Sequence, residues 1–335
     1  MTNELKRYLK NKKNLEDAFL YNPGHEHDSC GVGFVASTDG KQRREVVQGG
    51  IDALKAVWHR GAVDADGKTG DGAGILTQIP YNFFDDEIAK TGHEKRDEPL
   101  GIGMMFLPRN DYAALEKCRT IIESELLDHG YYIYGWRQVP INNSVIGEKA
   151  NSTRPEIEQV MFVNNIERDK DFDFAKELYL VRRRLEKRIA KQQINGFYVC
   201  SLSFESIIYK GLFLAEQLSI FYPDLANEEF ISSFAVFHQR YSTNTFPSWG
   251  LAQPFRLLAH NGEINTISGN TNWMRNHQTR ITTEIFGDDS EQVKPIIEKN
   301  VSDSSALDAA FELYVRAGRS VPLVKTLLIP EAWSK

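Results

Sequence analysis

Two adjacent apolar runs, Phe197–Ser203 and Glu205–Tyr209, limit this chain to folds that contain antiparallel strands. Apolar residues take alternate positions in both runs, and this period of two is typical of a hairpin with one buried face. Strands are also predicted at 32–37, 75–79, 101–107, 131–139, 158–163 and 233–237, and helices at 43–60, 111–127, 172–193, 213–221 and 303–316. Because strands come in hairpins and long helices in pairs, rather than in βαβ alternation, the sequence predicts a layered α+β fold.

Composition excludes several classes of protein. Hydrophobic residues make up 41% of the 335 residues, enough for a large core, and the absence of repeats and of a Ser/Pro-rich linker favours one continuous domain. The formal net charge of −6 argues against a nucleic-acid partner, and the run Arg182–Arg184 is interpreted as the solvated face of a helix. Three unpatterned cysteines give no metal-ligand spacing and indicate a reducing compartment. Without a leader or a long apolar run, the expected location is the cytoplasm, away from membranes.

The stretch around Cys30 carries the strongest chemical signal. Cys30 is followed by a flexible Gly31 and then by the apolar strand, and the core-building periodicity starts only after it. If the mature chain begins at Cys30, the free α-amine, with a pKa near ~8, can accept the thiol proton, so no histidine is needed. Residues 1–29, a short amphipathic helix and a loop, are then a propeptide. The alternative is a small buried cysteine behind an ordinary N-terminal arm.

Four polar residues at the ends of predicted elements fit one substrate, an α-amino acid with a side-chain amide. Arg240 can hold the α-carboxylate with a planar, bidentate cation, and Asp303 can hold the α-ammonium. Attack of Cys30 on the amide creates an oxyanion, for which the Asn261 side chain and the Gly262 N–H are candidate donors. Each residue also has a simpler interpretation: a surface ion pair for Arg240, a turn for Asn261–Gly262, and a helix cap at Ser302 or Asp303.

Two other features have weaker functional interpretations. The glycine-rich loop 69–74 precedes a strand rather than a helix, so a close approach of backbones is favoured over a phosphate cradle. His59, His238 and His260 each end an apolar segment, but no spacing pairs them with a carboxylate, and they are interpreted as hydrogen-bonded structural histidines.

At these residues the sequence resembles a known family. The stretches DSCGVGF, HRGAVDADGKTGDGAGIL and HQRYSTNTFPSWGLAQPFRLLAHNGEINT are similar to the glutaminase domain of glutamate synthase large subunits, a class II (N-terminal-nucleophile) glutamine amidotransferase. RYST and NGEI are shared widely among class II enzymes, whereas TNTFPSW and GNTNWM point to glutamate synthase. The resemblance runs from about Asp28 to the LIPEAW near the C-terminus.

The resemblance implies a fold and a set of site residues. The implied fold is a four-layer αββα sandwich of two antiparallel sheets, with a propeptide at 1–29 and an amidotransferase domain at 30–335 whose last strands are missing. Cys30 matches the nucleophile, Asn261 and Gly262 the oxyanion hole, and Arg240 and Asp303 the substrate-binding pair. Two further residues are assigned by the resemblance alone: Arg60 helps close the pocket, and Thr243 lines the site.

The resemblance also implies partners outside this chain. The substrate is L-glutamine, and the ammonia is destined for 2-oxoglutarate on a synthase domain, with a small reductase subunit as a further partner. FMN and an iron–sulfur cluster belong to that larger enzyme, and no cofactor or metal is expected in this chain. The alternatives are a non-catalytic truncated fragment or split-subunit binding module, and a class II amidotransferase with another acceptor, such as phosphoribosyl pyrophosphate or a sugar phosphate.

Overall fold

The structure is a computed structural model that describes residues 3–18, 31–239, 246–262, 264, 266–281, 283–299 and 301–329. The chain divides into two compact units, Met1–Cys30 and Gly31–Lys335. The first unit contains helix α1 (Asn3–Asp17), which confirms the predicted N-terminal helix. The other elements belong to the second unit.

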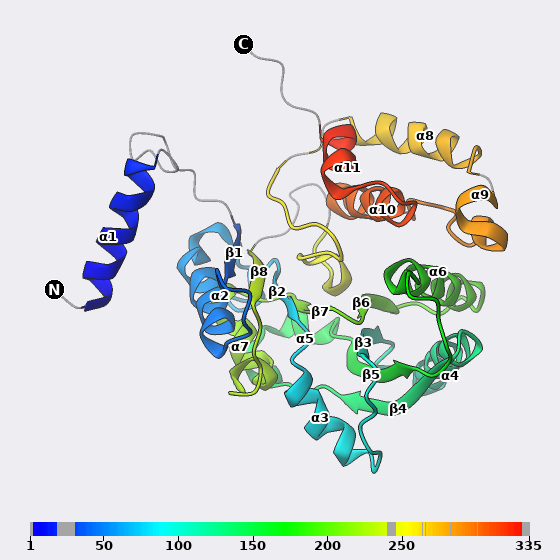
Figure 1. Cartoon of the computed structure of the whole chain (residues 1–335), viewed down its shortest axis with the longest axis horizontal. Helices are drawn as coiled ribbons and strands as arrows, with labels where there is room; N and C mark the ends of the chain where they lie inside the picture. The colour runs from blue at the N-terminus through cyan, green and yellow to red at the C-terminus, as the bar shows by residue number, and fades with distance from the viewer. Residues whose placement is uncertain are drawn as a thin grey trace. The chain divides into compact units, whose positions relative to one another are not determined.

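The described residues form two antiparallel sheets of four strands each (Figure 1). Sheet one has the order β1-β8-β2-β7, and sheet two the order β4-β5-β3-β6. The strands are β1 (Val32–Ala36), β2 (Ala73–Gln78), β3 (Leu100–Leu107), β4 (Tyr131–Gln138), β5 (Glu156–Asn164), β6 (Tyr198–Ser203), β7 (Ser206–Gly211) and β8 (Phe234–Gln239). The two predicted strands are confirmed as β6 and β7, but the predicted hairpin is wrong: β6 pairs with β3 and β7 with β2, so the turn between them leads from sheet two to sheet one.

Helices cover the two sheets on opposite sides of the molecule (Figure 1). Helix α2 packs on β1 and β8, whereas α4 and α6 pack on β4 and β6. The helices are α2 (Arg44–Ala56), α3 (Tyr81–Lys90), α4 (Tyr112–Asp128), α5 (Glu148–Ser152), α6 (Phe174–Lys191), α7 (Leu218–Phe221), α8 (Ile267–Gln278), α9 (Thr283–Phe286), α10 (Asp303–Arg316) and α11 (Val321–Leu328). This arrangement confirms the α+β class and the αββα sandwich. In the part of the chain that the structure describes, every helix is too short or too polar to cross a membrane.

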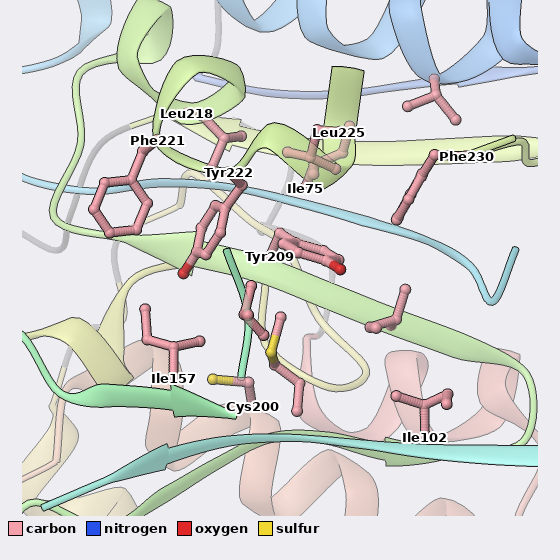
Figure 2. Packing of buried hydrophobic residues seen from close by; sticks show 14 of the residues in the cluster. Ile75, Ile102, Ile157, Cys200, Tyr209, Leu218, Phe221, Tyr222, Leu225 and Phe230 are labelled. Carbon is pink, nitrogen blue, oxygen red and sulfur yellow. The ribbon is translucent and has the colours of Figure 1, made fainter. Parts of the chain in front are cut away.

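The described residues form three apolar clusters that hold these layers together. The largest joins α2 to both sheets, and Figure 2 shows Ile102, Ile157 and Cys200 of sheet two facing Tyr209 of sheet one. A second cluster lies between sheet two and the pair α4 and α6. The third joins α6 to α9, α10 and the segment between those two helices. Helix α6 is therefore packed on two sides, which explains why it is buried along most of its length.

The interpretation of Arg182–Arg184 as a solvated face is wrong. Arg182 and Arg183 are buried and lie among carboxylates of α6 and α10. Arg182 pairs with Glu186 and with Glu312, at 2.8 and 2.6 Å. Because α10 packs on this side of α6, carboxylates rather than water molecules surround the arginine charges. Periodicity within one helix does not reveal a second helix packed on its polar face.

The glycine-rich loop confirms the prediction of a close backbone approach. A Cβ at Gly70 would lie 2.1 Å from the carbonyl oxygen of Phe213, so only glycine fits there. Asp66 organises the preceding turn, because its carboxylate accepts hydrogen bonds from the Thr69 amide and hydroxyl. These bonds hold the pKa of Asp66 well below its usual range.

Candidate functional site

The start of β1 and the end of β8 meet at one edge of sheet one. The two strands run antiparallel, and the Gln239 amide donates to the Gly31 carbonyl at 2.5 Å. A Cβ at Gly31 would lie 2.2 Å from the Gln239 carbonyl oxygen. Three predicted site residues, Cys30, Arg240 and Thr243, lie outside the described residues; the first is bonded to Gly31 and the second to Gln239.

The structure places Arg60 beside this edge. Arg60 ends the 3₁₀ helix η1 (Trp58–Arg60), and its Cβ lies 3.7 Å from the position that a Cβ would take at Gly31. Its Nε is buried and makes no hydrogen bond to any described residue. The fully buried Gln239 side chain packs on Gly61. Neither Nε2 nor Oε1 of this side chain makes a hydrogen bond to a described residue. Buried polar groups without partners are uncommon, and they cluster here around the start of β1.

The loop that contains Asn261 and Gly262 is fixed to the end of β8. His238, buried in β8, donates from Nε2 to the carbonyl oxygen of His260 at 2.9 Å, and the His260 amide donates to Gln253 Oε1 at 3.1 Å. Asn261 is half-buried and Gly262 is exposed. Near Gly262, the only described atom within contact range of an added Cβ is His260 Nδ1, at 3.8 Å. Among the described residues, little is therefore packed against the Cβ side of Gly262.

Asp303 begins helix α10. Ser302 caps that helix by accepting from the Ser305 amide at 3.1 Å, which decides between the two predicted caps. The buried Asp303 accepts from the Ser304 amide at 2.7 Å. The backbone N–H groups in the first turn of a helix favour a negatively charged group at this position, and the hydrogen bond from Ser304 fixes the direction of the carboxylate.

His260 directly precedes Asn261 and lies in the electrostatic field of Asp303. Burial lowers the pKa of His260, while the nearby negative charge of Asp303 raises it. The net direction is downward, so the ring is neutral at pH 7. The charge of Asp303 thus acts on His260 beside Asn261, and His238 of β8 joins this loop to the edge where Gly31 and Arg60 lie.

Sequence reasoning missed two residues at this site. Gln239 is recognisable only from its pairing with Gly31. Asp308, in α10, is recognisable only from its contact with the loop before Asn261. Its Oδ1 accepts hydrogen bonds from the amides of Leu257 and Leu258 at 3.0 Å each. Neither residue type is distinctive in its sequence context. Both act through residues far away along the chain.

A metal or cluster site is not found among the described residues. They contain no group of three His, Cys, Asp or Glu side chains arranged to hold a metal ion. Cys118 and Cys200 are free and buried in different apolar clusters, so they do not form a joint ligand set for an iron–sulfur cluster.

Comparison with known proteins identifies the family. Residues 30–335 match the family model of class II glutamine amidotransferases, and the match begins at Cys30. The chain is 60% identical over 318 residues to the glutamate synthase [NADPH] large chain of Azospirillum brasilense, covering 95% of this chain and 21% of that protein. It is 41% identical to the chloroplastic ferredoxin-dependent glutamate synthase of Spinacia oleracea (96% and 19%). It is also 41% identical to the glutamate synthase [NADPH] large chain of Bacillus subtilis (94% and 21%). The chain spans about one fifth of these relatives' length, and it belongs to the class II glutamine amidotransferases.

Proposed function

We propose that this chain hydrolyses the side-chain amide of L-glutamine to glutamate and ammonia, with Cys30 as the nucleophile. The main support for the proposal is that one strand, β8, contacts both the segment after Cys30 and the loop of the proposed oxyanion donors. Strand β8 pairs with Gly31 at the residue after Cys30, and through His238 it also holds the loop of Asn261 and Gly262. A class II family match that begins at Cys30 supports the assignment.

The chemistry follows from these groups. The α-amine of Cys30, exposed after removal of residues 1–29, takes the thiol proton, and the thiolate attacks the amide carbon. The Asn261 side-chain amide and the Gly262 N–H stabilise the oxyanion. The protonated amine returns its proton to the leaving nitrogen, ammonia departs, and water hydrolyses the γ-glutamyl thioester to glutamate and the free thiol. Arg240 and Asp303 hold the substrate α-carboxylate and α-ammonium, while Arg60 and Thr243 shape the pocket.

The ammonia acceptor lies outside this chain. The similarity to glutamate synthase large chains supports 2-oxoglutarate as the acceptor, on a synthase domain that would carry the FMN and the iron–sulfur cluster. A small reductase subunit is the remaining proposed partner. Two free buried thiols agree with a reducing compartment, and we place the protein in the cytoplasm.

A direct test compares ammonia release by the wild type, Cys30→Ala and Cys118→Ala. N-terminal sequencing and intact mass first establish whether the chain begins at Cys30; if it does not, all three are produced with residue 30 as the first residue. Cys30→Ala is expected to release no ammonia above background, whereas Cys118→Ala, which changes a buried thiol in the helical layer, retains turnover per folded molecule. Turnover by Cys30→Ala at the wild-type rate contradicts the mechanism. A folded wild type without turnover supports the non-catalytic fragment.

A further inference from the structure

The segment that leads to Asn261 has little regular structure of its own. After the 3₁₀ helix η5 (Trp249–Leu251) it folds into a tight turn, in which the Phe255 amide donates to the Leu258 carbonyl at 2.9 Å. A segment of this kind depends on tertiary contacts for its position, because it lacks the repeated hydrogen bonds of a helix or sheet.

Asp308 supplies the central contact from helix α10. Its Oδ1 accepts from both the Leu257 and Leu258 amides at 3.0 Å, three to four residues before Asn261. The side chain is fully buried, and Oδ2 makes no hydrogen bond to a described residue. Burial raises the pKa of Asp308. One oxygen atom therefore satisfies two partly buried backbone donors.

The same helix begins with Asp303. Asp308 follows Asp303 by five positions, which is about 7.5 Å of helix rise. One rigid element therefore carries both the predicted ligand of the substrate ammonium and the anchor of the oxyanion loop. A neighbouring contact strengthens the anchor, because Arg256 donates to Glu312 Oε2 on α10 at 3.3 Å and to the Val199 carbonyl of β6 at 2.8 Å.

We propose that Asp308 is a positioning residue for glutamine hydrolysis, which sets the distance between Asp303 and the oxyanion donors Asn261 and Gly262. The inference rests on the proposed function. Without the Oδ1 acceptor the loop is free to shift relative to α10, and substrate would still bind at Asp303 while the oxyanion donors are misplaced. Because these donors act on the transition state, the loss falls on kcat rather than on KM.

The test measures glutamine kinetics of Asp308→Ala and Asp308→Asn in the full chain beginning at Cys30, normalised to active sites titrated with an electrophilic glutamine analogue. For Asp308→Ala, kcat per active site is expected to fall roughly ten- to hundredfold, as misplacement by about 1 Å can cause, with KM within about threefold. Asp308→Asn keeps a carbonyl oxygen for the two amides and should recover most of kcat.

Asp224→Ala is the matched control. Asp224 is also a buried carboxylate, but it binds Arg137 and Tyr209 rather than the loop. Its loss should lower stability without lowering kcat per active site. An unchanged kcat in Asp308→Ala, or a folded Asp308→Asn whose kcat per active site falls roughly tenfold or more, overturns the inference alone; the Asn variant is compared with the wild type, so it remains a test even if Asp308→Ala fails to fold. An inactive wild type instead overturns the proposed function, and the inference with it.

Discussion

Gly31 lies so close to Gln239 that the carbonyl oxygen of Gln239 occupies the space of a side chain, 2.2 Å from where a Cβ would stand. Gly31, the first described residue of the second unit, is therefore in direct contact with Gln239, the last residue of β8. Since Cys30 precedes Gly31 and Arg240 follows Gln239 in the chain, this contact is adjacent in sequence to two residues of the proposed site.

Gly31→Ala should therefore damage both activity and stability. The added methyl meets a backbone oxygen that cannot rotate away, so β1 must shift, at a cost of about 1–3 kcal/mol in the free energy of unfolding. Ammonia release and urea denaturation measure the two effects. The control is Gly49→Ala in α2, whose Cβ meets only the Val35 side chain at 3.4 Å and which should gain about 0.5–1 kcal/mol in helix propensity. Equal behaviour of the two variants would refute the steric explanation.

Gly262→Ala is expected to separate activity from stability. Within the described residues an added Cβ finds only an ordinary contact with His260, so the free energy of unfolding should change by less than about 0.5 kcal/mol. The methyl would, however, protrude into the space where we place the substrate amide, and glutamine turnover should drop by roughly a hundredfold. Circular dichroism melts and ammonia release measure the two quantities. A variant that unfolds, or one that turns over glutamine normally, contradicts this account of Gly262.

The sequence predicts most elements of the fold because their signals are local. Helix α10 spans the predicted residues, and all eight described strands were expected within a few residues of their observed bounds. Helix α3 was not predicted: its buried residues Phe83, Phe84 and Ile88 share one face, but the helix has only 10 residues and therefore few repeats of that pattern. The predicted helix 43–60 ends earlier, at Ala56, and continues as η1, which turns Arg60 toward the start of β1.

The candidate site is only partly predictable for a related reason. Asn261, Gly262 and Asp303 are suggested by residue type next to element ends, and their roles remain predictions. The proposed role of Asp308 depends on Leu257, about 50 residues away in the sequence, and that of Gln239 depends on Gly31, about 200 residues away. Such pairings depend on how helices and sheets pack, and no periodicity within a single element encodes them.

Thiol reactivity should distinguish Cys30 from the other cysteines. Burial raises the pKa of Cys118 to about 11 and that of Cys200 to about 12, and both side chains are inaccessible. Because the thiolate is the reacting form, iodoacetamide at pH 7.5 should leave both unmodified. We expect peptide mass mapping to find the label at Cys30 and glutamine to slow that labelling. Label on Cys118 or Cys200 in folded protein would contradict the packing described here, and indifference to glutamine would contradict the role of Cys30.

The buried pair of Arg137 and Asp224 should dominate the stability of the region between the sheets. Two parallel hydrogen bonds of 2.7 and 2.8 Å join them, and Tyr209 donates to Asp224 at 2.8 Å. Asp224→Ala leaves the Arg137 guanidinium without its main partner, at a cost of about 3–5 kcal/mol. Tyr209→Phe removes two hydrogen bonds, the one donated to Asp224 and the one accepted from Gln159 Nε2 at 2.9 Å, and should cost about 1–3 kcal/mol. Urea denaturation of both variants gives the comparison, and a smaller loss for Asp224→Ala than for Tyr209→Phe would show that the ion pair is not the main contributor.

Lys210 should make stability depend on alkaline pH. Its ammonium is fully buried, donates to the Gly250 carbonyl at 2.8 Å and lies over the rings of Tyr198 and Phe255. Burial lowers the pKa of Lys210 from 10.5 to about 8. Below pH 8 the lysine is protonated in both states, so it adds no pH dependence.

Between about pH 8 and 10.5 the folded lysine is neutral while the unfolded one is still charged. The unfolded state then binds more protons, and the free energy of unfolding rises with pH, by up to about 1.4 kcal/mol per unit. Other groups titrate in this range, so the measured quantity is the difference between wild type and Lys210→Met in urea at pH 7.5, 8.5 and 9.5. That difference should shift in favour of the wild type as pH increases. A constant difference would mean that Lys210 keeps its proton in the fold, stabilised by the Gly250 carbonyl and the two rings despite its burial.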